Sequence, residues 1–320
     1  MKQLLPFFLC LLLTASLLSC EAAPYTVDFF AFDTYNYIRV YSDRDRDAAV
    51  QAQALCLSFD RAASAYDANS ELSLINQSSG GTVGTLLLPI LRRSLELRDY
   101  TDGSFDPTLL TLSQLWNIGT ESFRIPSDEE LQIAREPDAD VLLSDNVVDL
   151  QGCMLDFGGI MKGYACSAVL SSLRTAGVRR ALVSLGGNIG VISDTDPFKI
   201  GIADPNDPSR MLGALTVTEG ILSVSGSYER YSESDGVRYS HILDPRTGRP
   251  VTGDLSCSVV VGQDGALCDA VSTALFVMGF DRAASFAEAH AEDFSVLLIR
   301  ENGEIYLSKS LKESFVFEND

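Results

Sequence analysis

A long succession of short strand-like segments between residues 141 and 310 constrains the fold more than any other feature. Each is rich in β-branched or aromatic residues and is bounded by turn residues. The segments are "VDLQGCMLDF", "RALVSLGGNIGVI", "FKIGIAD", "ILSVSGSYERY", "SCSVVVG" and "FSVLLIRENGEIYLS". Two helical patterns interrupt them, "KGYACSAVLSSLRTAG" and "CDAVSTALFVMG". This order predicts an α+β fold with a largely antiparallel sheet and inserted helices, and no dinucleotide-binding GxGxxG follows a strand.

The first half of the chain adds one strand region and two long helices. "YTVDFFAFDTYNYIRVYS" alternates apolar and polar residues and predicts strand structure. "RDAAVQAQALCLSFDRAASAY" and "LLLPILRRSLELRDYTDG" have helical spacing, and Gly103 is a plausible stop for the second.

The N-terminus "MKQLLPFFLCLLLTASLLSC" has the pattern of an export signal over residues 1–19. Its end, "LLSC", resembles the bacterial lipobox, which implies lipidation of Cys20 and attachment to a membrane surface. A buried N-terminal helix is the alternative. We therefore expect a single domain over residues 20–320, exported and lipid-anchored to the outer face of the bacterial cytoplasmic membrane or periplasmic.

The charge balance limits the ligands. The 320 residues carry 44 acidic and 24 basic side chains, a formal net charge of -20, with no basic cluster. Nucleic-acid partners are therefore excluded, and an anionic ligand needs a few local cations, backbone amides or a metal ion. The five cysteines beyond Cys20 show no CxxC pair, so neither a disulfide framework nor a zinc site is indicated.

Two stretches present groups suited to phosphate and to a hard cation. In "LDFGGIMKGYACSAVLSSL", Asp156 ends a predicted strand, a Gly-Gly turn follows, and a helix begins near Lys162. Such a turn can bind phosphate through its amides, although many Gly-Gly turns are purely structural. In "CDAVSTALFVMG", Asp269 and Thr273 lie one helical turn apart and offer the oxygen ligands that Mg²⁺ prefers. The alternative is that Asp269 caps the helix N-terminus and Thr273 belongs to the core.

One of the two histidines, His241, precedes a turn of rigid composition in "HILDPRTGRP". Asp244 can bond back into the turn, and Gly248 permits a left-handed backbone. A lone histidine at a strand end is more often structural than catalytic. The other histidine, His290, lies in a charged helical segment and is predicted to be solvated.

Two further loops could contact a planar ring. "LRDYTDGSFDPTLLTLSQLWNIG" contains Ser104, Phe105 and Asp106, which could equally form a helix-to-loop turn. In "FDRAASAYDANSELSLINQSSG", Tyr66 precedes a Ser-capped turn and helix.

Taken together and in this order, these stretches resemble the ApbE flavin transferases, also called FAD:protein FMN transferases. The resemblance runs from about Phe32 to about Gly279 and rests on "LDFGGIMKGYA", "LVSLGGNIGV", "HILDPRTGRPV" and "DAVSTALFVMG". It implies Mg²⁺-dependent cleavage of FAD and transfer of FMN to a Thr or Ser hydroxyl of a partner protein, with release of AMP. The alternatives are an FAD pyrophosphatase and a non-catalytic flavin-binding lipoprotein.

The resemblance also assigns roles to residues. It makes the Gly159 carbonyl, Asp269 and Thr273 the metal ligands, and His241 the group that serves the incoming hydroxyl. The positions that it implies for FAD contacts are Phe32, Tyr66, Ser104, Phe105, Asp106, Asp156, Lys162 and Ile242. The chain departs from the family pattern at Phe32-Asp33 (for Met-Gly) and at Ser167 and Ser227 (for Asp), and Ser272 stands where some members carry another acid.

Overall fold

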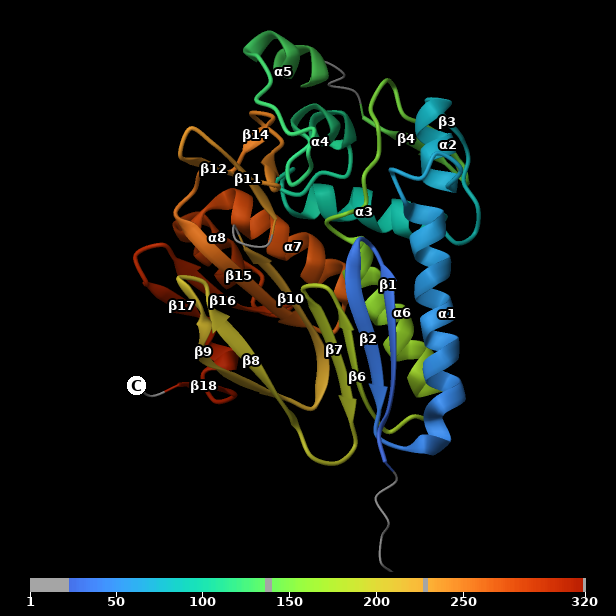
Figure 1. Cartoon of the computed structure of the whole chain (residues 1–320), viewed down its shortest axis with the longest axis vertical. Coiled ribbons are helices and arrows are strands. Elements are labelled where there is room, and N and C mark those ends of the chain that lie inside the picture. Colours follow the sequence, from blue (N-terminus) through green and yellow to red (C-terminus); the bar gives the residue numbers. More distant parts are fainter. Residues whose placement is uncertain (1–22, 136–139, 227–229, 319–320) are drawn as a thin grey trace, which may run out of the picture.

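The structure is a computed structural model that describes residues 23–135, 140–226 and 230–318 (Figure 1). The expected signal segment, Cys20 and Ser227 lie outside these residues, so the predicted export, lipidation and domain boundaries stay predictions. Within the described ranges, every helix is too short or too polar to cross a membrane.

The first strand region is a hairpin of β1 (Tyr25–Ala31) and β2 (Thr34–Val40). Its two-residue turn consists of Phe32 and Asp33, which both have a φ of 54°. Two left-handed residues are what a type I′ turn requires, although Phe at such a position is unfavourable. The Phe32 amide donates to Asp60 Oδ1 at 2.7 Å, and this bond to the neighbouring helix helps to hold the turn.

The central sheet has eight strands in the order β1-β2-β6-β7-β10-β15-β16-β17, and all neighbouring strands are antiparallel, as predicted. Its other members are β6 (Arg180–Leu185), β7 (Asn188–Ser193), β10 (Glu219–Gly226), β15 (Leu255–Gly262), β16 (Ser295–Arg300) and β17 (Ile305–Leu307).

Helices cover one face of this sheet and a small second sheet covers part of the other (Figure 1). The helical layer contains α1 (Arg46–Ala63), α3 (Leu88–Tyr100), α6 (Met161–Thr175), α7 (Gly265–Met278) and α8 (Phe280–Ala289). The second sheet contains β8 (Phe198–Asp204), β9 (Asp207–Val217) and β18 (Phe315–Phe317). Shorter helices at the top of Figure 1 are α2 (Glu71–Gln77), α4 (Leu110–Trp116) and α5 (Asp128–Arg135).

The segment 148–157, expected to be one strand, is mostly loop. Only β5 (Val147–Asp149) is a strand there, between β3 (Gly80–Thr82) and β4 (Leu142–Ser144). The chain then turns through Gln151 and Gly152, both with positive φ, which interrupts the ladder. A single bridge joins Met154 to Leu109, and Asp156 therefore lies in a loop rather than at a strand end.

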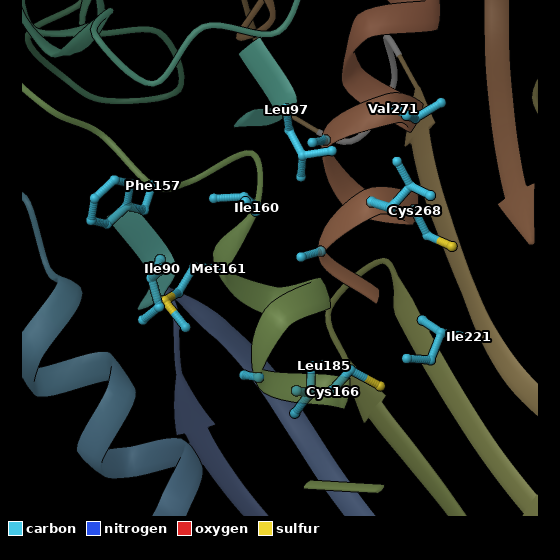
Figure 2. Packing of buried hydrophobic residues seen from close by; sticks show 14 of the residues in the cluster. Ile90, Leu97, Phe157, Ile160, Met161, Cys166, Leu185, Ile221, Cys268 and Val271 are labelled. Carbon is cyan, nitrogen blue, oxygen red and sulfur yellow. The ribbon is translucent and has the colours of Figure 1, made fainter. Parts of the chain in front are cut away.

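Helices α6 and α7 cross in close contact. A Cβ atom at Gly163 would lie 2.0 Å from the Gly265 carbonyl oxygen, so neither position has room for a side chain. Around the crossing, Ile160 and Met161 at the start of α6 and Cys268 and Val271 on α7 belong to one buried apolar cluster (Figure 2). This crossing fixes where the two helices present their polar groups.

Candidate active site

A cavity of about 630 Å³ opens at the carboxyl end of β10, beneath the segment that carries α4. The sequence-predicted residues within the described part of the chain come from six separate stretches, yet all of them line this cavity. They are Phe32, Tyr66, Ser104, Phe105, Asp106, Asp156, Gly159, Lys162, His241, Ile242, Asp269 and Thr273. Cys20 lies outside the described residues.

Asp269 lies on the wall formed by α7 and is only 4% exposed. The helix begins one turn earlier than the motif suggested, because Asp264 accepts hydrogen bonds from the amides of Ala266 and Leu267. The alternative that Asp269 is the helix cap is therefore wrong. Its Oδ2 accepts a hydrogen bond from the Gly163 amide at 2.8 Å, and the carboxylate lies at the cavity wall.

Gly159 and Thr273, the other two expected metal-binding positions, line the same cavity, and the Thr273 hydroxyl donates to the Asp269 backbone carbonyl at 3.4 Å. Thr273 is one helical turn further along α7, and a Cβ built on Gly159 would lie 3.5 Å from its Oγ1. No group of three His, Cys, Asp or Glu side chains suited to a metal ion occurs among the described residues. A cation at this wall would therefore depend on hydroxyl and backbone oxygens together with Asp269.

Ser272 does not take part in the cavity wall. Its side chain is fully buried, and its hydroxyl donates to the Asp269 carbonyl oxygen at 2.8 Å. Since that proton is used, Ser225 is the donor in the 2.8 Å contact between the two serine hydroxyls. Ser272 thus bonds the backbone of α7 on the side of the helix that does not line the cavity.

The start of α6 forms the adjoining wall. Lys162 Nζ donates to the Gly158 carbonyl at 3.2 Å, and the Gly158 amide donates to Asp156 Oδ1 at 2.8 Å. The sequence predicted that amides of the Gly-Gly turn could bind phosphate. The Gly158 amide already donates to Asp156 and is therefore not available for this. Burial raises the pKa of Asp156, while the Gly158 amide and the charge of Lys162 oppose the shift.

The loop with Ser104, Phe105 and Asp106 is ordered by its own hydrogen bonds. The Phe105 amide donates to Thr101 Oγ1 at 3.1 Å, and its ring is 3% exposed and packs on Gly159. Asp106 Oδ1 accepts from the amide and the hydroxyl of Thr108 at 2.8 and 2.7 Å. The loop presents a fixed carboxylate beside an apolar surface.

His241 follows β12 (Val237–Ser240), as expected of a strand-end residue, and its ring is accessible from the cavity. Its Nδ1 lies 3.0 Å from the Arg230 carbonyl oxygen. A carbonyl can only accept, so Nδ1 carries the proton and Nε2 keeps its lone pair. Desolvation by the surrounding protein is the main cause that lowers the pKa of His241 to about 4, and the positive charges of Lys162 and Arg230 lower it further. The hydrogen bond to the Arg230 carbonyl acts in the opposite direction and raises the pKa. The imidazole is therefore neutral and can accept a proton at Nε2.

The turn after His241 has the predicted form. Asp244 Oδ1 accepts from the Arg246 amide at 2.9 Å, and Gly248 has a φ of 68°. Trp116 Nε1 donates to the Gly248 carbonyl at 2.8 Å and ties the turn to α4. The turn is thus held in place by a tryptophan that is distant in the sequence, in addition to its own hydrogen bonds.

Sequence reasoning missed two polar residues of this region. Arg230 lines the cavity and packs on Gly119, where a Cβ would lie 2.7 Å from its Nε. Asn188, buried in β7, donates from Nδ2 to Asp269 Oδ1 at 3.0 Å. Both lie in stretches predicted to be strands. Asn188 also stands within the motif "LVSLGGNIGV", where a polar residue at a buried strand position was the available signal. Arg230 is exposed and offered no such signal.

Two other expectations have clear outcomes. Ser167, which replaces the usual acid, accepts a hydrogen bond from the Gly265 amide at 2.8 Å, so its hydroxyl serves the start of α7. His290 is half-buried and stacks on Phe286 with ring centroids 4.2 Å apart, so the prediction of a solvated histidine is wrong. None of the five described cysteines forms a disulfide, which agrees with the absence of a disulfide framework.

Comparison with known proteins gives consistent results. The profile of the ApbE family matches residues 32–298. The FAD:protein FMN transferase of Vibrio cholerae is 31% identical over 263 residues, which are 78% of this chain and 79% of that protein. The protein of the same description from Treponema pallidum is 30% identical over 279 residues, covering 78% and 77%. Among solved structures, the ApbE protein of Thermotoga maritima superimposes with a TM-score of 0.85 at 29% identity, covering 93% of this chain and 100% of that one. The flavin transferase ApbE from Vibrio cholerae gives 0.81 at 27% identity, covering 92% and 99%.

Proposed function

The chain belongs to the ApbE family, and on that premise we propose that it is an FAD:protein FMN transferase. It cleaves the pyrophosphate of FAD, attaches FMN to a Thr or Ser hydroxyl of a partner protein, and releases AMP. The observation that carries this proposal is the convergence of a neutral histidine and a buried acid-hydroxyl pair on one cavity.

The cavity fits a divalent cation. Its described lining contains four carboxylates, those of Asp33, Asp106, Asp156 and Asp269, against only Lys162 and Arg230 as permanent cations. A diphosphate would be poorly compensated by these groups alone. Asp269, the Thr273 hydroxyl and the Gly159 carbonyl are hard oxygen donors and would hold Mg²⁺. When bound, the ion would neutralise diphosphate charge and polarise the phosphorus–oxygen bonds.

His241 activates the acceptor. The hydroxyl oxygen of the acceptor attacks the phosphorus of the FMN half, and its proton passes to His241 Nε2. A bond forms between that oxygen and phosphorus, and the bond to the AMP oxygen breaks, with the electron pair leaving on AMP. Lys162 and Arg230 supply local positive potential for the bound phosphates.

The test is incubation with FAD, Mg²⁺ and an acceptor protein. We expect AMP release together with flavin that stays on the acceptor through denaturation, and loss of both in the presence of a chelator. AMP and free FMN without labelled acceptor would instead indicate an FAD pyrophosphatase. Binding of FAD with no AMP would indicate a flavin-binding lipoprotein and would overturn the proposal.

We further propose that the enzyme is exported and that lipidation of Cys20 anchors it to the outer face of the cytoplasmic membrane; a periplasmic location is the alternative. The signal-like segment and the "LLSC" sequence support this. The acceptor would then be an exported or membrane redox protein. Mass spectrometry of the N-terminal peptide should find a diacylglyceryl group on Cys20, and Cys20→Ser should release the protein from the membrane fraction. A Cys20→Ser protein that stays with the membrane would contradict it.

A further inference from the structure

A buried chain of hydrogen bonds leads from the central sheet to Asp269. Ser223 on β10 and Asn188 on β7 are register partners, and they are 0% and 1% exposed. The Ser223 hydroxyl donates to Asn188 Oδ1, and Asn188 Nδ2 donates to Asp269 Oδ1 at 3.0 Å. The reverse amide orientation would place its oxygen against the carboxylate, so this arrangement determines which end of Asn188 faces Asp269.

The two oxygens of Asp269 are thus held by different elements. Oδ1 accepts from Asn188 on β7, while Oδ2 accepts from the Gly163 amide at 2.8 Å on α6. Turning the carboxylate so that both oxygens face one ion would break at least one of these bonds. A buried acceptor that loses its donor is costly, so the carboxylate is held in one orientation.

We propose that Asn188 is a positioning residue that sets the affinity of this site for Mg²⁺ and its preference for Mg²⁺ over Ca²⁺. The inference rests on the proposed metal-dependent function. Mg²⁺ demands a compact octahedral shell and takes single carboxylate oxygens, whereas Ca²⁺ accepts larger, often bidentate shells. A carboxylate fixed by two N–H donors offers one oxygen to an ion and disfavours chelation. Ser223 acts one step further away, by orienting the amide.

The experiment measures the binding of Mn²⁺ alone to the folded chain by electron paramagnetic resonance, with Mg²⁺ and Ca²⁺ as competitors and without FAD or acceptor. Asn188→Leu keeps the approximate volume and removes the N–H donor. We expect its Mn²⁺ affinity to fall by about 10- to 100-fold, the usual effect of losing a residue that orients a ligand. The Mg²⁺ to Ca²⁺ preference should also shrink, because the freed carboxylate can turn.

Two variants separate this role from general destabilisation. Ser223→Ala leaves the amide in place and should change affinity and preference in the same direction by less. Asn76→Leu removes another buried side-chain amide. This amide makes two hydrogen bonds to the backbone of Leu155, of 2.8 and 2.9 Å, and is not part of the cavity lining. The substitution should lower the melting temperature and leave Mn²⁺ affinity and ion preference unchanged.

The Mn²⁺ measurements separate a failure of the positioning role of Asn188 from a failure of the proposed function. Wild-type affinity and preference in folded Asn188→Leu would overturn the inference and leave the proposed function standing. If that variant does not fold, an unchanged Ser223→Ala overturns the inference instead. Wild-type protein that binds no Mn²⁺ would overturn both the inference and the metal-dependent part of the proposed function.

Discussion

The two sides of the cavity are built differently. On the α6–α7 side, Asp269 is almost fully buried and each of its oxygens accepts an N–H bond from a separate element. On the side formed by the small hairpin, His241 is accessible and its ring is held by one carbonyl group. A rigid wall suits the diphosphate, which is the same in every reaction cycle. An open wall suits the larger group that must enter and leave.

Each wall depends on a specific structural feature. The buried wall needs paired helix glycines, because α6 and α7 approach so closely that a Cβ at Gly163 would overlap the Gly265 carbonyl. The open wall needs an external anchor, which Trp116 provides through the Gly248 carbonyl.

The largest expected effect is on the open wall. His241→Ala should reduce FMN transfer by about 10²- to 10⁴-fold, because the general base is lost, while FAD binding stays within a few-fold. Covalent flavin on denatured acceptor measures the first quantity, and titration with FAD measures the second. His290→Ala, which removes the other histidine and lies outside the cavity lining, is the matched control. Transfer at the wild-type rate in His241→Ala would remove the histidine from the mechanism.

On the buried wall, Asp269→Ala should lower activity by at least about 100-fold, the scale of losing a key electrostatic stabiliser. AMP release should fall together with transfer, since both require the same diphosphate cleavage. Comparing the two products in one assay checks this. Full activity of the variant in the presence of a chelator would show that neither the acid nor a metal is needed.

The helix crossing that supports the buried wall can be tested through stability. Gly163→Ala forces the helices apart and should cost about 1–3 kcal/mol of unfolding free energy, as overpacking does. Thermal or urea unfolding measures it, with Ser171→Ala on the exposed side of α6 as control. An unchanged unfolding free energy would mean that the two helices separate freely.

The pH profile sharpens the description of the open wall. The pKa of His241 lies at about 4, below its ordinary value of 6.5, so the basic form persists on acidification. We expect the histidine-dependent limb of kcat/KM to be flat from pH 8 to about pH 5 and to fall only near pH 4. In a stability measurement the same shift favours unfolding as the pH drops below 6.5, because the unfolded chain binds the proton first. A limb centred near 6.5 would show that the surrounding protein does not lower the pKa of the imidazole.

The smallest effect is expected behind the buried wall. Ser272→Ala removes a hydroxyl that bonds the Asp269 carbonyl and should cost about 0.5–1.5 kcal/mol of stability. Mn²⁺ affinity should stay at the wild-type value, because Ser272 is absent from the cavity lining. Weaker Mn²⁺ binding, measured beside the unfolding curve, would place Ser272 among the metal ligands after all.

Local patterns in the sequence determined much of this protein. Helical spacing predicted α1, α3, α6 and α7, and turn chemistry predicted the corner at Asp244 and Gly248, because these signals reside in neighbouring residues. The family motifs also named twelve residues that the structure places around one cavity, and the comparisons confirm the family.

Only the tertiary structure decided how those residues are held. The bond from Asn188 to Asp269 joins residues 81 positions apart, and the proton position on His241 depends on the Arg230 carbonyl. Neither contact can be predicted from periodicity or local motifs, since each arises when separate elements pack and buried polar groups must find partners. The sequence carries the chemical groups, and packing gives them their orientation.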